Sequence, residues 1–166
     1  MRRLAPALLL TLPLALGACG LHPLYAGGGA GPVAGTLSAV EVPPIEGKAG
    51  WLVGNALRDR LGATGSARYR LDIKLDDSIV GLGVRRDDSV SRERRTLRAR
   101  YQLVSLADGK TVLDATAGSD AGIDAVGSEY ATIAAENSAL ERLSTTLADK
   151  IVARVAVYAQ QRSATP

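Results

Sequence analysis

The sequence predicts an α+β fold: a two-layer α/β sandwich in which two helices pack on one face of a mostly antiparallel four-stranded sheet, in the order βαβββα. Apolar and polar residues alternate along residues 69–75 and 97–103, which is typical of strands with one buried face. The dipeptide Asp108-Gly109 after the second of these strands favours a tight hairpin turn. A continuous apolar stripe from Leu140 to Tyr158 predicts a long final helix over residues 129–161.

The composition fits one folded domain and excludes several classes of function. Removing Arg2 and Arg3, which lie in a segment expected to be cleaved, from the 20 basic residues leaves 18 against 17 acidic ones, a net charge of +1. Bulk charge therefore does not indicate a nucleic-acid partner. One cysteine and one histidine exclude an internal disulfide and a Cys/His metal cluster. Motifs for a catalytic nucleophile or a phosphate-binding loop are missing, so we expect neither an enzyme nor a metal or other cofactor.

The first residues have the tripartite form of an export signal. Met1-Arg2-Arg3 is basic, residues 4–16 are apolar, and the small residues Gly17 and Ala18 precede Cys19. The sequence Leu-Gly-Ala-Cys at this point resembles the bacterial lipobox, which predicts a signal peptide over residues 1–18. Cys19 would then carry a covalent diacylglycerol and an N-acyl lipid, anchoring the chain to a membrane. The competing interpretation is an ordinary signal peptide followed by a chance cysteine.

Residues 19–35 are interpreted as a lipidated N-terminus and a flexible tether. Gly20 follows the cysteine, whereas lipoproteins retained in the inner membrane carry Asp there, so the resemblance places the anchor in the outer membrane, on its periplasmic side. Residues 26–35 contain five glycines and one proline, a composition typical of a flexible linker. His22 has no titratable partner nearby in the sequence and is interpreted as a solvent or headgroup contact rather than a catalytic group.

The remaining chain, residues 36–162, is predicted to form one domain. We expect Gly62 to end the first helix, because glycine commonly follows a helix C-terminus. We expect Ser128 to cap the last helix and residues 163–166 to fray. The expected elements are strands at 36–42, 69–84, 90–106 and 111–119, helices at 51–61 and 129–161, a hairpin tip at 85–88 and a loop at 120–127.

The stretch from Cys19 to Tyr25, Cys-Gly-Leu-His-Pro-Leu-Tyr, resembles the mature start of the lipopolysaccharide-assembly lipoproteins of the LptE family, with Leu21 where Phe is usual. The segment from Arg95 to Leu103 resembles a family strand, and residues 130–151 resemble the final helix of its short, alphaproteobacterial-type members. The resemblance implies the predicted two-layer fold. It also implies a plug and assembly partner of the LptD β-barrel that binds lipopolysaccharide.

Seven arginines fall within sixteen residues of the second long strand and the tip before it, and guanidinium groups bind phosphate oxygens through paired hydrogen bonds. The strand period places four of them on one face, and Arg68, Arg70 and Lys74 join them if the neighbouring strand presents the same side. The alternative is an ordinary solvated face, partly neutralised by Asp87, Asp88 and Glu93. The candidate lipopolysaccharide-binding residues are Arg92, Arg94, Arg98 and Arg100; the other arginines of the cluster are Arg85, Arg86 and Arg95.

A second function stays open at this point. An auxiliary lipid-binding lipoprotein of an envelope ABC transporter would share the anchor and a small α/β domain. Co-purification distinguishes the two, because one predicts recovery of a large outer-membrane barrel and the other recovery of a transporter complex. A membrane-anchored hydrolase is a more distant alternative, since no catalytic motif supports it.

Overall fold

The structure is a computed structural model that describes residues 31–62, 66–84, 90–125 and 128–163. The expected signal peptide, the lipidated Cys19, His22 and the hairpin tip with Arg85 and Arg86 lie outside the described residues. Side chains are described for all of these ranges except residues 83, 84, 90 and 91.

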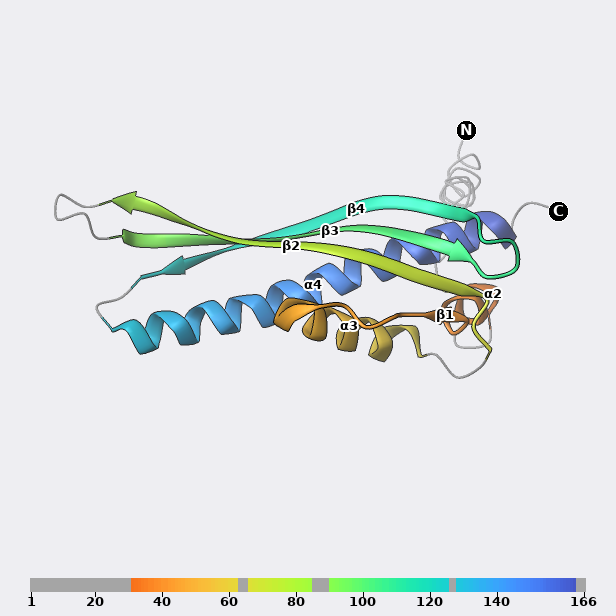
Figure 1. Ribbon diagram of the computed structural model, residues 1–166, viewed down its shortest axis with the longest axis horizontal. Helices are drawn as coiled ribbons and strands as arrows, with labels where there is room; N and C mark the ends of the chain where they lie inside the picture. Colours follow the sequence, from red (N-terminus) through yellow and green to blue (C-terminus); the bar gives the residue numbers. More distant parts are fainter. Residues whose placement is uncertain (1–30, 63–65, 85–89, 126–127, 164–166) are drawn as a thin grey trace, which may run out of the picture.

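The predicted fold class is confirmed. A four-stranded sheet in the order β1-β2-β3-β4 lies over two helices, α3 and α4, which both lie on its lower side in Figure 1. β1 (Val40–Glu41) runs parallel to β2 (Tyr69–Val84), and β3 (Val90–Ser105) and β4 (Thr111–Asp124) follow in antiparallel pairs. The sheet is therefore mixed, and a third helix, α2, precedes it.

The core lies between the sheet and the helices. Leu71 of β2 pairs with Leu103 of β3, and both side chains are buried on the face that covers the helices. From Leu97 to Leu103, β3 alternates apolar residues on this face with polar residues on the other, so burial of one face fixes the register. The other large, fully buried residues of the cluster are Leu97, Tyr101, Val40, Val53, Leu57, Leu140, Leu147, Ile151 and Val155.

α3 (Gly47–Leu61) begins four residues before the predicted start and ends where expected. Gly62 adopts the left-handed conformation with φ of 59°, and its N–H donates to the Arg58 carbonyl. The earlier start brings Gly50 against the preceding segment: a Cβ there would lie 2.5 Å from the Ile45 carbonyl oxygen. Only glycine permits this close approach.

The N-terminal side of the domain corrects two predictions. The expected strand at 36–42 is wrong for its first part, and the expected tether does not extend to residue 35, because α2 (Pro32–Leu37) occupies residues 32–37. Val33 and Leu37 are one turn apart on this helix, and both are buried in the core cluster. Tertiary burial of this apolar pair overrides the flexibility suggested by the neighbouring glycines, while residues 26–30 lie outside the description.

The loop predicted at 120–127 is also wrong for its first five residues. β4 continues through Asp124, pairing as far as Arg92 of β3. Glycine, alanine and aspartate have weak strand preference, but the ladder with β3 supplies hydrogen bonds that local propensity does not predict. The turn before β4 is confirmed, with Gly109 at φ of 69° and its N–H bonded to the Ser105 carbonyl.

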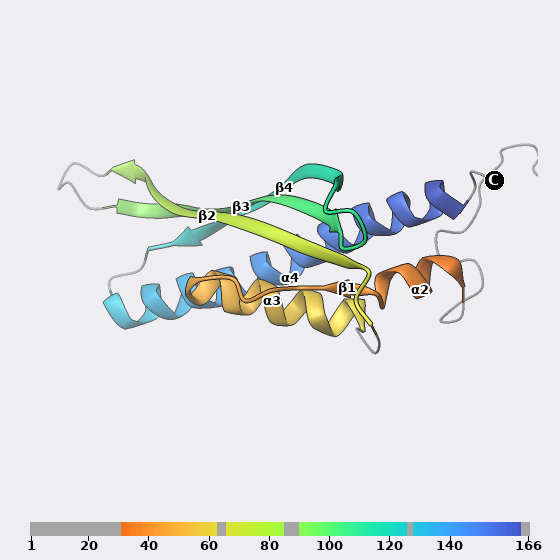
Figure 2. The same cartoon turned by 45° about the vertical axis from the view of Figure 1, so that its right-hand side comes forward.

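α4 (Glu129–Ser163) spans 35 residues and runs along the sheet (Figures 1 and 2). Glu129 lies in its first turn, where a negative charge complements the helix dipole. Ser163, predicted to fray, belongs to the helix, and residues 164–166 lie beyond the description. Among the described helices, none combines the length and apolar content needed to cross a membrane.

Candidate functional site

The four candidate arginines share one face of the sheet, as the strand period predicts. Arg92, Arg94, Arg98 and Arg100 are exposed on the face turned away from the helices. Leu97, Ala99 and Tyr101 alternate with them and are buried on the opposite face. We call the exposed side, with its residues from β2, β3 and β4, the outer face. Whether these arginines bind lipopolysaccharide stays a prediction.

The register of β2 adds cations and acids to the outer face. Lys74 pairs with Arg100 and Asp76 with Arg98, so side chains of both strands project from the same side. Arg70 also belongs to this face, where its guanidinium donates two hydrogen bonds to Asp72 at 2.8 and 2.9 Å. The neighbouring strand therefore presents Arg70 and Lys74 with the candidate arginines.

Two of the candidate arginines are ion-paired across the strands. Arg100 donates to Asp114 at 2.9 Å, and Arg92 donates to Asp124 at 3.1 Å. The hydrogen bond from Arg100, with a second from Gln102, lowers the pKa of the Asp114 carboxyl. Asp114 and Asp124 of β4 partly neutralise these two arginines. Arg92 and Arg100 are therefore less available than Arg94 and Arg98 for binding an external anion.

The other two candidates are less compensated. Arg94 and Arg98, like Lys74, make no ion pair with any residue that the structure describes. Arg98 lies over Gly118 of β4, where an added Cβ would meet the Arg98 Cγ at 3.3 Å. Because Gly118 has no side chain, the aliphatic part of the Arg98 side chain can pack against the backbone of β4 at this point.

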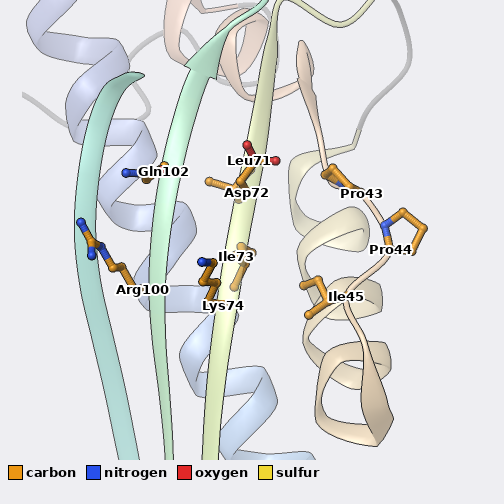
Figure 3. Close-up of a pocket in the computed structure, with 9 residues that line it drawn as sticks. All are labelled: Pro43, Pro44, Ile45, Leu71, Asp72, Ile73, Lys74, Arg100 and Gln102. Carbon is orange, nitrogen blue, oxygen red and sulfur yellow. The ribbon is translucent and has the colours of Figure 1, made fainter. Parts of the chain in front are cut away.

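Two adjoining hollows follow from this arrangement. One, of about 630 Å³, crosses the three long strands, and its charged lining consists of Lys74, Arg98 and Arg100 with Asp76 and Asp120. The other, of about 340 Å³, lies between β2 and the segment Pro43-Pro44-Ile45 that leaves β1 (Figure 3). Lys74 and Arg100 line both hollows, so the two cations stand where the hollows meet. The arrangement can bind an anionic group spread across the sheet.

The contribution of β4 to this site was missed in the sequence. Gly118 and Thr116 line the larger hollow, and Gly122 lies opposite Arg94. The available signal was the concentration of small residues between Thr116 and Gly122, which we instead interpreted as an irregular strand and a loop. Within the ranges described, no group of three or more His, Cys, Asp or Glu residues could hold a metal ion.

Arg95 occupies the opposite face from the candidates. Its guanidinium makes a bidentate contact with Asp77 at 2.6 and 2.8 Å and donates to the Glu136 carbonyl of α4 at 3.0 Å. The hydrogen bond to Asp77 is the largest cause that raises the pKa of Arg95, and the charges of Asp77 and Glu136 raise it further. Arg95 therefore joins the sheet to α4 and is not part of the outer face.

Solved structures with this fold come from several bacteria. A protein from Caulobacter crescentus described as a lipoprotein is 24% identical, with a TM-score of 0.65 over 78% of this chain and 98% of that one. Rare lipoprotein B from Shewanella oneidensis is 12% identical, with a TM-score of 0.59 over 75% of this chain and 97% of that one. At these identities the likeness concerns the fold. A search of curated proteins found no match.

Sequence comparison assigns the family. The model of the LptE family, described as lipopolysaccharide-assembly, matches residues 37–155, which is more than half of the 166 residues. The match spans β1, both helices of the sandwich layer for most of their length, and the three long strands that build the outer face. The chain therefore belongs to the LptE family of lipopolysaccharide-assembly proteins.

Proposed function

We propose that this protein is an outer-membrane lipoprotein, anchored through lipid on Cys19 at the periplasmic side, that serves as plug and assembly partner of an LptD-like β-barrel and binds lipopolysaccharide. Membership of the LptE family supports a role in lipopolysaccharide assembly. The sequence that resembles a lipobox supports a lipid anchor on Cys19. The alternative, an auxiliary lipoprotein of an ABC transporter, has less support, because the matched family is described as lipopolysaccharide-assembly.

The plug role draws support from the shape and polarity of the sheet. The three long strands and α4 form a slender body that is much longer than it is thick (Figures 1 and 2). Its outer face carries the exposed cations Arg94, Arg98 and Lys74, with Val80 as an exposed apolar neighbour of Arg94. Interiors of large membrane barrels are polar and hydrated, so such a face can lie in a barrel lumen without losing hydration.

The observation that carries the binding proposal is the hollow of about 630 Å³ with Lys74 and Arg98 on its floor. Lipopolysaccharide carries phosphates, and a guanidinium or ammonium that lacks a carboxylate partner can bind a phosphate oxygen without first breaking an ion pair. Asp76 and Asp120 also line the hollow, so the local positive charge is moderate. This arrangement favours reversible contact along a transport path over permanent capture.

Reversing the two cations tests the binding proposal. We expect the double variant Lys74→Glu, Arg98→Glu to lower lipopolysaccharide affinity by about tenfold or more, since each lost charge-assisted contact is worth on the order of 1.5–3 kcal/mol. Binding of purified lipopolysaccharide to the folded full chain measures this. The matched control is Arg142→Glu on the exposed side of α4, which should leave the affinity unchanged. Equal affinity of the double variant and the wild type would remove the outer face from the proposal.

Recovery of partners tests the plug role separately. Affinity purification of the detergent-extracted chain should recover a large outer-membrane β-barrel protein in stoichiometric amount. Recovery of an ABC transporter complex in its place would favour the auxiliary lipoprotein. Lys74→Glu with Arg98→Glu is informative here too, because retained barrel and lost lipopolysaccharide would separate docking from ligand binding.

A further inference from the structure

A second cationic site lies at one end of the molecule, away from the outer face. α2, the turn between β3 and β4, and the last turn of α4 gather at the right-hand end in both views (Figures 1 and 2). The Leu106 N–H donates to the Arg68 carbonyl at 2.9 Å and so joins the turn to the start of β2. A hollow of about 420 Å³ opens here, and Arg68, Tyr69, Leu106 and Arg162 are its principal lining residues. We call it the basal hollow.

The two arginines of the basal hollow are held by neutral groups. Arg162 donates through one terminal nitrogen to the hydroxyls of Tyr69 and Tyr158, each at 3.2 Å. The two tyrosine rings meet edge to face with centroids 6.4 Å apart, which fixes the position of both acceptors. Arg68 donates to the Gly35 carbonyl of α2 at 3.2 Å. Neither arginine forms an ion pair with a carboxylate of the described chain.

The nearby acid, Asp108, offsets these cations only in part, because it attracts Arg162 weakly and is also paired with Lys110. Asp108 in the adjacent turn lies 3.7 Å from Lys110, and their side chains are 49% and 78% exposed. A pair at that distance and exposure is weak and adds no net negative charge. The C-terminal dipole of α4 opposes an anion, but Arg162 itself lies in that last turn and offsets it. The basal hollow therefore keeps an excess of positive charge.

An exposed apolar residue lies beside these cations. Leu106 is 44% exposed at the hollow, although most large apolar residues of the domain are buried. Cations next to an exposed leucine are typical of surfaces that lie at a membrane interface, where phosphates and the start of the acyl region are close together.

The chain enters the domain at this same end. The described chain begins at Gly31, immediately before α2, and the Gly35 carbonyl of that helix accepts the hydrogen bond from Arg68 of the basal hollow. Eleven residues lie between Cys19 and Gly31, and the glycine-rich composition of this stretch predicts a linker with a mean reach of about 18 Å. A lipid on Cys19 would therefore keep the basal hollow within reach of the leaflet.

We propose that the basal hollow binds phosphate groups of the lipid leaflet that holds the Cys19 anchor, so that the domain docks on the membrane by this end. The inference rests on the lipid anchor of the proposed function. Docking by the base directs the outer face and the far end of the sheet away from the leaflet, which leaves them free for the barrel and for lipopolysaccharide.

Site-specific labelling of the lipidated full chain tests the docking. Lipidation blocks Cys19, so Leu106→Cys supplies the one free thiol for an environment-sensitive fluorophore. The chain is incorporated into vesicles of phosphatidylcholine alone or with phosphatidylglycerol. We expect the label at position 106 to report a headgroup environment in the anionic vesicles. The matched control label, Tyr130→Cys, is 89% exposed at the opposite end of α4 and should report water in both.

Charge variants separate electrostatic docking from a structural role. Each basic residue near an anionic leaflet contributes about a fivefold preference for the surface, so Arg68→Gln with Arg162→Gln should lower the ratio of docked to undocked chains about thirtyfold. Arg68→Lys with Arg162→Lys keeps both charges and should retain docking. Loss of docking in the lysine variant as well would assign the arginines a structural role and overturn the proposal.

Two failures remain distinguishable. A chain that floats with the vesicles while its label at position 106 reports water overturns the docking and leaves the anchor intact. A chain that floats with neither vesicle overturns the anchor, and this inference falls with it. Folding of each variant is checked by its thermal unfolding midpoint.

Discussion

Neighbouring arginines on β3 have different roles because successive residues of a strand point to opposite faces. Arg98 is exposed on the outer face, whereas Arg95 points to the helices, where its side chain is only 11% exposed. Arg95 contacts Asp77 of β2 and the Glu136 carbonyl of α4. One residue type thus serves a solvent-facing site and a link between the two layers.

Removing Arg95 should destabilise the fold more than removing an exposed arginine. Arg95→Leu leaves Asp77, 25% exposed, without its partner, which should cost about 2 kcal/mol in the free energy of unfolding. The control is Arg92→Leu. The Arg92 and Asp124 side chains of that ion pair are 65% and 74% exposed, so this substitution should change the free energy of unfolding by less than about 0.5 kcal/mol. Urea unfolding measures both. Equal effects of the two substitutions would contradict this role.

Asp114 should make stability depend on pH in the acid range. Hydrogen bonds from Arg100 and Gln102 lower its pKa from 3.8, so the ionised carboxylate stabilises the fold above the unfolded pKa. This contribution is lost as the pH falls through the folded pKa. We expect Asp114→Asn to be less stable than wild type at pH 7 and the difference to shrink below about pH 4.

The control for Asp114 is the same substitution in an Arg100→Gln background. Because Arg100 is the largest cause of the lowered pKa, its removal should flatten the acid dependence. Thermal unfolding at a series of pH values measures this. A stability difference that stays constant into acid would show that Asp114 acts through packing rather than charge.

At the scale of elements, α2 and α3 show opposite uses of glycine. Gly50 of α3 permits close approach to the segment after β1, whereas Gly35 of α2 has no atom within 4 Å of an added Cβ. The sequence predicts both glycines outside a helix, Gly35 in the expected tether and Gly50 just before the predicted helix at 51–61. Their surroundings, which the tertiary structure sets, decide whether alanine is tolerated.

Gly→Ala substitutions at the two positions should therefore differ in sign. Gly50→Ala places a Cβ 2.5 Å from the Ile45 carbonyl oxygen and should cost about 1–3 kcal/mol, because backbone must shift to accommodate it. Gly35→Ala should stabilise the protein by about 0.5 kcal/mol, since alanine restricts the unfolded chain and fits the helix. Chemical denaturation of the two variants compares them. Destabilisation by both would argue against the described geometry of α2.

For the whole molecule, the two layers separate two kinds of surface. The helices and the inner face of the sheet form the core, and the outer face presents Arg94, Arg98 and Lys74 to solvent. The basal hollow is lined by Arg68, Tyr69, Leu106 and Arg162 and lies beside α2, whose Gly35 carbonyl accepts a hydrogen bond from Arg68. The two surfaces that we propose to meet the membrane and lipopolysaccharide therefore lie on different parts of the domain.

The proposed anchor makes a prediction for the whole chain. Cys19→Ser removes the thiol that would carry the diacylglycerol, so we expect the variant to appear in the soluble fraction or as an uncleaved precursor. Membrane fractionation and the intact mass of the mature chain measure this. Cys19→Ala serves as a second variant, and normal membrane association and mass in both would overturn the lipid assignment.

The alternation of apolar and polar residues in strands, the apolar period of the helices and the glycines at turns are local patterns. They predicted most of the fold. The alternation along residues 97–103 gave the correct buried face, and the same period placed Arg92, Arg94, Arg98 and Arg100 together on the other. Gly62 and Gly109 act at the predicted helix end and turn. Local steric preferences act within a few residues, which is why they can be read without a structure.

The sequence by itself determined the strand faces, the long last helix and the resemblance to the LptE family. The tertiary structure decided which arginines are ion-paired, that α2 packs on the core, and that β4 extends to Asp124. These features depend on partners far away along the chain: Arg100 meets Asp114, β4 pairs with β3, and Arg68 meets Gly35. Contacts between distant segments form only when the sheet and helices assemble, so no local pattern of residues encodes them.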